Sequence, residues 1–181
     1  MTKLMELRTV QSNAFRTLVE VLKDVLNDIN ITFDASGMRI MAMDGSHVAL
    51  IHMKLFSEKF EYYNCKEKFN AGMCMSSLYK LMKTVSNNDT LTMYVEEESM
   101  DELCIKVENE PKNSSTLFKL KLLDIDIEEL NIPDVEINCI VTMPSNDFQR
   151  MCRDMMQISD ALELTTQGTN LTLSCNGDFA S

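Results

Sequence analysis

The stretch Ser12-Asn13-Ala14-Phe15 returns as Ser145-Asn146-Asp147-Phe148, 133 residues further along the chain. Each copy follows a short apolar segment and opens a run in which apolar residues recur every three or four positions, the spacing of an amphipathic helix. A third unit of this kind begins near Ser76, and serine is a favoured N-cap residue. The sequence therefore predicts three strand–helix units, with N-capped helices over 12–27, 76–86 and 145–158.

Short apolar or alternating segments, separated by turn residues such as Ala35-Ser36-Gly37 and Asp44-Gly45-Ser46, fill the rest of the chain and are typical of strands. The predicted strands are 4–10, 29–33, 38–43, 48–54, 60–65, 69–75, 90–95, 103–108, 116–122, 137–143, 161–166 and 171–175. We therefore expect an α+β fold built from repeated strand–helix units. A repeat that cannot bury its own face needs neighbours, so the third unit is expected to require a fourth, which these 181 residues do not include.

Between the second and third units lies the segment Leu123-Asp124-Ile125-Asp126-Ile127-Glu128, which alternates apolar and acidic residues. An extended backbone places the two sets on opposite faces. We predict a connector laid across the surface with its apolar side down. The pair of aspartates resembles a metal-binding Asp-x-Asp, but acids alternating along a surface strand are more typical of a solvated face. We therefore expect no metal, no cofactor and no catalytic residues.

The net charge of −11 argues against nucleic acid if the charge is spread evenly. Each predicted helix nevertheless carries two cations off its apolar stripe, at spacings of three or seven that keep each pair on one side. Such pairs occur on the solvated side of any amphipathic helix. Repeated three times, they also fit a surface that follows a DNA backbone without reading bases. The residues alone leave both interpretations open for Arg16, Lys23, Lys80, Lys83, Arg150 and Arg153.

The remaining composition narrows the class of protein. None of the six cysteines forms a Cys-x-x-Cys pair, so we expect reduced thiols in an intracellular protein. The first residues lack the apolar core of a secretory signal. No apolar run reaches the length of a membrane span, so we expect no membrane association.

Three segments carry a family resemblance. Met43-Asp44-Gly45-Ser46-His47-Val48-Ala49-Leu50 resembles a segment of the eukaryotic sliding clamp family, proliferating cell nuclear antigen. Residues 123–133 are similar to that family's interdomain connecting loop, and residues 143–154 to its third helix. The resemblance spans the chain and implies a DNA clamp (processivity) fold with helices on one face of curved antiparallel sheets and three of the usual four units. It implies an N-terminal clamp domain over 1–118, a connecting loop over 119–135, and the first half of a C-terminal domain over 136–181.

The resemblance also implies a function. Three such subunits close into a homotrimeric ring in the nucleus, encircle double-stranded DNA, and tether DNA polymerase, the clamp loader and repair proteins that carry a short clamp-binding peptide. An alternative is a non-encircling module that binds partner peptides or modulates a full-length clamp. The resemblance places channel cations at Arg16, Lys23, Lys80, Lys83 and Arg153, with Arg150 nearby. It places the peptide pocket at Met43, His47, Val48, Leu50, Leu130, Ile132 and Pro133.

Overall fold

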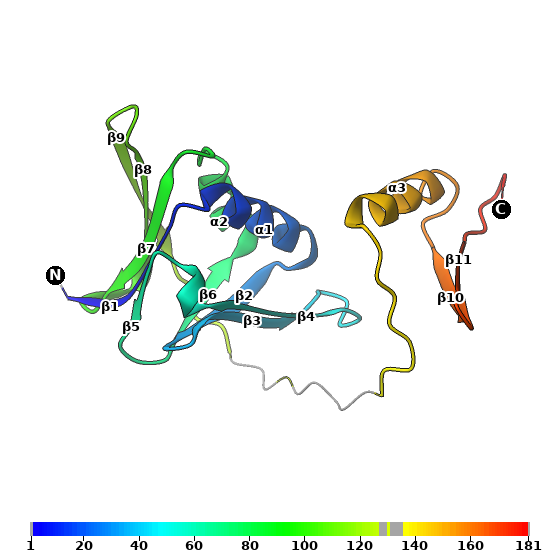
Figure 1. Ribbon diagram of the computed structural model, residues 1–181. Helices are drawn as coiled ribbons and strands as arrows, with labels where there is room; N and C mark the ends of the chain where they lie inside the picture. The colour runs from blue at the N-terminus through cyan, green and yellow to red at the C-terminus, as the bar shows by residue number, and fades with distance from the viewer. Residues whose placement is uncertain (1, 127–129, 131–135, 181) are drawn as a thin grey trace. The chain divides into compact units, whose positions relative to one another are not determined.

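The computed structural model describes residues 2–126, 130 and 136–180, which form two units joined by the connector (Figure 1). Unit 1 comprises Met1–Asn131 and unit 2 comprises Ile132–Ser181. Each unit is described by itself below.

Unit 1 contains two antiparallel sheets with two helices on one side of them (Figure 1). Helices α1 (Ser12–Val25) and α2 (Met75–Met82) lie side by side. Sheet A has the strand order β5-β1-β7-β8-β9, and sheet B has the order β4-β3-β2-β6. The strands are β1 (Lys3–Thr9), β2 (Asp28–Asp34), β3 (Gly37–Met43), β4 (Leu50–Phe56), β5 (Tyr62–Cys65), β6 (Phe69–Cys74), β7 (Thr90–Glu96), β8 (Ser99–Asn109) and β9 (Ser114–Lys121), with a 3-10 turn η1 at Ser57–Lys59.

The core of unit 1 forms where the apolar stripes of the helices meet the inward residues of the strands. On β2, every second residue from Ile29 to Phe33 is buried, as expected for a strand with one covered face. On the helices, residues three and four apart are buried, as their periodicity predicts. The apolar core residues of these helices are Phe15, Val19, Leu22, Met75, Leu78 and Met82. The α+β class with antiparallel sheets is confirmed.

The predicted N-cap at Ser12 is wrong. Ser12 is the first residue of α1 and is completely buried, and its hydroxyl donates a hydrogen bond to the Ser86 carbonyl oxygen at 3.0 Å. The hydroxyl cannot cap its own helix because it is turned towards the segment that follows α2. None of the three helices has a side-chain hydrogen bond at its N-cap, and α2 ends at Met82, short of the predicted residue 86.

Unit 2 repeats the arrangement of the first half of unit 1. It contains α3 (Ser145–Met155) and the hairpin of β10 (Glu163–Gln167) and β11 (Asn170–Ser174). The start of α3 lies 133 residues after that of α1, at 145 against 12. The hairpin loops keep the same offset, because 168–169 corresponds to 35–36 between β2 and β3. The predicted repeat is therefore confirmed in register as well as in pattern.

The predicted strand over 137–143 is wrong, because residues 137–143 form no strand. In unit 1 the corresponding strand, β1, is paired on both sides, by β5 and by β7. The described part of unit 2 contains only the hairpin and the helix, so no strand is present to pair with this segment. Its apolar residues are left exposed, among them Ile137, Ile140 and Val141.

Candidate nucleic-acid interface and partner hollow

Two cations at the C-terminal end of α2, Lys80 in its last turn and Lys83 just after it, have no ion-pair partner among the described residues. Lys80 and Lys83 are exposed, and neither makes an ion pair with any residue that the structure describes. The spacing of three places both outside the buried stripe formed by Met75, Leu78 and Met82. These two ammonium groups are thus available to an anion.

Arg16 on α1 is partly engaged by the protein itself. Its Nη1 donates to the Val85 carbonyl oxygen at 2.9 Å, and its Nη2 donates to Asn13 Oδ1 at 2.6 Å. The guanidinium therefore ties α1 to the segment after α2. An arginine has five N–H donors, so Arg16 keeps donors for a ligand, but its position is fixed by the fold.

Lys23 on α1 is held by a cluster that the sequence did not reveal. Its Nζ lies 2.5 Å from Asp24 Oδ1 and 4.8 Å from the centre of the Tyr79 ring. The Tyr79 hydroxyl in turn donates to Glu20 Oε1 at 2.8 Å. The hydrogen bond with Asp24 raises the pKa of Lys23, so the lysine stays charged. Its charge is nevertheless largely matched by neighbouring acids, and Lys23 is a weaker anion site than Lys80.

Of the two predicted cations in unit 2, one faces an acid and the other does not face any described acid. Arg150 Nη2 lies 3.5 Å from Asp147 Oδ1, one turn earlier on α3, and both side chains are well exposed. Arg153 is exposed and has no ion pair with a described residue. Three of the predicted cations therefore lie in the helices of unit 1, Lys83 directly follows α2, and two lie in the helix of unit 2. Of the six, Lys80, Lys83 and Arg153 are not engaged by described side chains.

The turn after β3 is organised by Asp44. Its carboxylate accepts hydrogen bonds from the backbone N–H groups of Ser46, Val48 and Ala49 at 3.1, 2.8 and 2.6 Å, and from the Ser46 hydroxyl. These bonds, the Ser46 hydroxyl first, hold the pKa of Asp44 well below its usual range. Because Asp44 uses the amides of residues 48 and 49, β4 begins at Leu50 and not at the predicted residue 48.

Four residues predicted to bind partner peptides lie in or beside this turn. His47 adopts a left-handed backbone with φ of 57°, and its neighbour Val48 is 84% exposed. Leu50 and Met43, paired across β3 and β4, are half-buried.

The first part of the connector is fixed to sheet B at a glycine. Leu123 N–H donates to the Gly72 carbonyl oxygen at 2.7 Å, forming an isolated antiparallel bridge. A Cβ atom at Gly72 would lie 2.1 Å from the Leu123 carbonyl oxygen, so no larger residue fits without moving the connector. Asn30 adds hydrogen bonds from its Nδ2 to the carbonyl oxygens of Ile125 and Asp126, at 3.0 and 3.3 Å. The prediction of a connector with its apolar side down holds for Ile125, which is half-buried near Gly72, but not for Leu123, which is 41% exposed.

A hollow of about 730 Å³ lies between this connector and the outer face of sheet B. It brings together three of the predicted pocket residues, Met43, His47 and Leu130. Val48 and Leu50 do not line it, and Ile132 and Pro133 lie outside the described residues. Polar residues that the sequence prediction missed make up much of the wall, including Asn30, Thr32, Arg39, Lys68 and Asn70.

Metal-binding and membrane-spanning features are not found in the described part of the chain. Among residues 2–126, 130 and 136–180, no three His, Cys, Asp or Glu side chains are grouped so that they could hold a metal ion. None of the described helices is both long and apolar enough to cross a membrane. The cysteines are all free thiols, and Cys104 is the buried one.

Comparison with known proteins covers nearly the whole chain. The model of the N-terminal domain of proliferating cell nuclear antigen matches residues 4–130, and the model of its C-terminal domain matches residues 131–181. The probable DNA polymerase sliding clamp 1 of Paramecium bursaria Chlorella virus 1 is 36% identical over 182 residues, which cover 98% of this chain and 70% of that protein. The chain therefore belongs to the proliferating cell nuclear antigen family of sliding clamps.

Proposed function

We propose that this protein is a sliding clamp subunit, a DNA polymerase processivity factor whose helices face duplex DNA. The single observation that carries this proposal is the family match, which extends over both domain models and is supported by a relative named as a DNA polymerase sliding clamp. The free cations Lys80 on α2, Lys83 just after it and Arg153 on α3 support it, because sequence-independent DNA contact requires charges that are free to meet phosphates.

The proposal extends to partners and assembly. Three subunits form a ring around double-stranded DNA, and β9, an edge strand of sheet A, supplies one side of the contact between subunits. Polymerase, clamp loader and repair proteins dock a short peptide between the connector and the turn at Asp44. The clamp domain ends near residue 118, the connector runs to residue 135, and the chain works in the nucleus or at a viral replication site. The family consists of non-enzymatic processivity factors, and we propose that this chain likewise has no catalytic activity and no cofactor.

Retention on DNA tests the proposal. The protein is loaded by a clamp loader onto nicked circular duplex DNA, and retention is compared after the circle is cut. We expect retention on the circle and loss from the linear form. The double variant Lys80→Glu, Lys83→Glu should lose most of the retention, whereas the control Lys106→Glu, Lys112→Glu, with the same charge change on sheet A and its β8–β9 loop, should keep it.

The alternative of a non-encircling module is favoured by one observation, the absence of any buried residue among the described residues of unit 2. Light scattering coupled to size-exclusion chromatography separates the two. A trimer that persists on dilution supports the ring, whereas a monomer at micromolar concentration that still binds partner peptides supports the module.

A further inference from the structure

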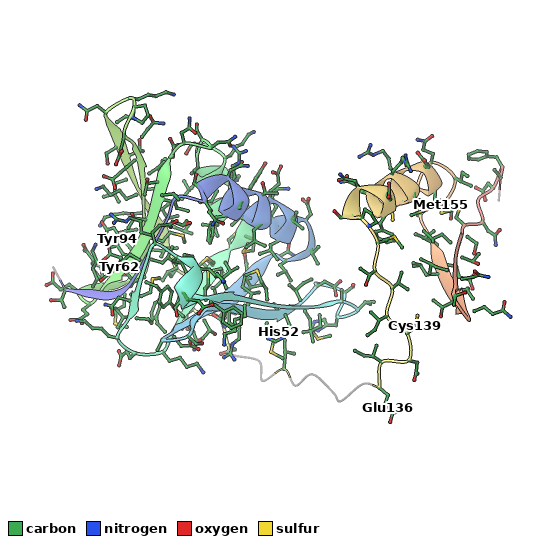
Figure 2. All side chains as sticks on the ribbon, in the orientation of Figure 1. His52, Tyr62, Tyr94, Glu136, Cys139 and Met155 are labelled. Atoms are coloured by element: carbon green, nitrogen blue, oxygen red, sulfur yellow. The ribbon has the colours of Figure 1, made fainter. Side chains whose placement is uncertain are left out.

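The outer face of sheet B, turned away from α1 and α2, carries a row of hydrogen-bond donors. Strand register places Lys54, Arg39, Thr32 and Asn70 side by side on β4, β3, β2 and β6. The residues flanking them on β2 and β3 are buried in the core, so alternation turns this row outward. Figure 2 shows His52, which lies two residues before Lys54 and on the same face, on the side of the sheet away from α1. With the exposed Lys68, two residues before Asn70, these residues form what we call the donor row.

The donor row offers donors and almost no acceptors. The Thr32 hydroxyl donates to Asn70 Oδ1 at 2.7 Å, which occupies the amide oxygen and leaves the Asn70 NH₂ group for a ligand. Arg39, Lys54 and Lys68 make no ion pair with any described residue, in a chain whose net charge is −11. Three uncompensated cations on one sheet face of so acidic a protein are suited to bind carboxylates.

One acid on this face, Asp34, offsets the charge of the row only in part. Asp34, at the end of β2, accepts hydrogen bonds from the Ser36 N–H at 2.7 Å and from the Ser36 hydroxyl. These bonds are the main reason that the pKa of Asp34 is lowered, and the charges of Lys54 and Arg39 add to them. Asp34 is therefore held in its own turn and forms no ion pair with Lys54 or Arg39, so both cations can still contact an external anion.

Part of the donor row lies in the wall of the hollow between the connector and sheet B. Arg39, Thr32, Asn70 and Lys68 line the same hollow as the proposed peptide-binding residues Met43, His47 and Leu130. The wall of the hollow also contains acids: Asp28 lies four residues from Thr32 on β2, roughly 13 Å away at about 3.3 Å per residue, and Asp44 lies in the turn after β3. Asp126, on the connector, is the third acid of the wall.

Resting on the proposed function, we propose that the donor row is a specificity site for partner peptides, which binds an acidic segment next to the clamp-binding turn. Four strands about 4.8 Å apart give the row a length of roughly 14 Å, which matches about four residues of extended peptide. Duplex DNA fits this face less well, since a continuous polyanion would also meet Asp28, Asp44 and Asp126. The occupant is thus a short run of aspartate or glutamate, held beside an apolar anchor.

Fluorescence anisotropy with synthetic peptides tests the inference. The resemblance implies a clamp-binding peptide of the pattern Gln-x-x-aliphatic-x-x-aromatic-aromatic, and the probe Gln-Ser-Ser-Leu-Ser-Ser-Phe-Phe follows it. The probe is extended at either end by Glu-Glu-Glu or, as the neutral control, by Gln-Gln-Gln. We expect the glutamate extension at one of the two ends to tighten binding to the 181-residue protein about tenfold at low salt, from a few rim ion pairs. The gain should shrink as salt is raised, because these charges are exposed.

Variants test whether the tighter binding of the glutamate-extended peptide depends on the donor row. The triple variant Arg39→Gln, Lys54→Gln, Lys68→Gln should remove the gain, measured within that variant as the ratio of its affinities for the glutamate and the neutral peptide. The control Lys106→Gln, Lys112→Gln, Lys121→Gln removes the same charge elsewhere in unit 1 and should keep the gain. Circular dichroism of both variants checks that each is folded, and if the triple variant is not, the single variant Arg39→Gln should halve the gain at least.

The outcomes separate this inference from the proposed function. Binding of the neutral peptide with no glutamate gain at either end overturns the inference alone, as does a gain that survives in the triple variant. Failure of every peptide to bind overturns both the peptide docking and the inference. A triple variant that loses affinity for linear duplex DNA and keeps its peptide preference makes the row a DNA surface and overturns the inference.

Discussion

Phe15 in unit 1 and Phe148 in unit 2 occupy the same position of the same repeat, yet Phe15 is 6% exposed and Phe148 is 38% exposed. In unit 1 a second strand–helix unit supplies α2 and three strands of sheet A (β7, β8 and β9), and the two repeats bury each other's apolar faces. In the described part of unit 2 a single repeat stands alone, and none of its residues is buried. The comparison shows that the repeat carries its own secondary structure but obtains its core from a neighbour.

The largest expected effect is on the core of unit 1. Phe15→Ala should lower the free energy of unfolding by about 3–5 kcal/mol, because it removes a buried aromatic ring and leaves a cavity. The matched change Phe148→Ala should cost less than about 1 kcal/mol. All four tyrosines lie in unit 1, so urea unfolding followed by tyrosine fluorescence reports on that unit.

Hydrogen exchange of the β10–β11 amides provides the corresponding measurement for unit 2. Equal destabilisation of the two units by the two changes would contradict the idea that only unit 1 has a core of its own.

The next effect concerns the point where the connector leaves unit 1. Gly72→Ala places a Cβ atom against the Leu123 carbonyl oxygen and should detach the connector, with a cost to unit 1 of about 1–3 kcal/mol. Faster hydrogen exchange of the Leu123 amide would reveal the detachment. Gly45→Ala is the control, because its nearest neighbour would lie at 3.7 Å. Unchanged exchange at Leu123 in the Gly72 variant would show that the bridge does not hold the connector.

A smaller effect distinguishes free from paired cations on the helices of the two units. Lys80→Gln and Arg153→Gln should each weaken duplex binding several-fold and reduce the salt slope by about 0.9 for each phosphate that the variant no longer neutralises. Lys23→Gln and Arg150→Gln should have less effect, because Asp24 and Asp147 already face those cations. Titrations at several salt concentrations measure the slopes, and equal slopes for all four variants would refute the distinction.

The smallest effect is a pH dependence confined to the turn of unit 1. The folded-state pKa of Asp44 is depressed, so its stabilisation is fully present above the unfolded value of about 3.9 and is lost only as the pH falls through the lower folded value. Carbon NMR of the Asp44 carboxyl group should give a midpoint well below 3.9. The amide signals of Val48 and Ala49 should shift with the same midpoint, and a midpoint near 3.9 would show that the turn does not depend on this carboxylate.

Local patterns predicted much of the fold. Apolar spacing located all three helices and the buried face of α1, although Val25, which fits the spacing, is exposed at the end of the helix. Alternation and turn residues located the hairpins around 35–36 and 168–169. The prediction of a strand over 137–143 was wrong because a strand needs neighbouring strands to pair with, and β-propensity alone does not supply them.

Contacts between residues far apart in the chain could not be predicted from the sequence. The bond from Ser12 to Ser86 and the one from Arg16 to Val85 join residues about 70 positions apart, and no local pattern marks them. The pairing of Lys23 with Asp24 was visible as a neighbour in sequence, but the Tyr79 ring beside it was not. Part of the donor row could have been predicted, because Arg39 and Lys54 fall on outward positions of two predicted strands. Their position side by side depends on the strand register, which the sequence does not give.

Chemical-shift mapping with duplex DNA tests the central claim most directly, because it detects weak contacts residue by residue in this 181-residue protein. We predict that two duplexes of unrelated sequence perturb the same amides, on the exposed sides of α1, α2 and α3, and that added salt abolishes both sets of changes. Changes centred on the outer face of sheet B, or different for the two sequences, would contradict the assignment of the helices as the DNA-facing surface.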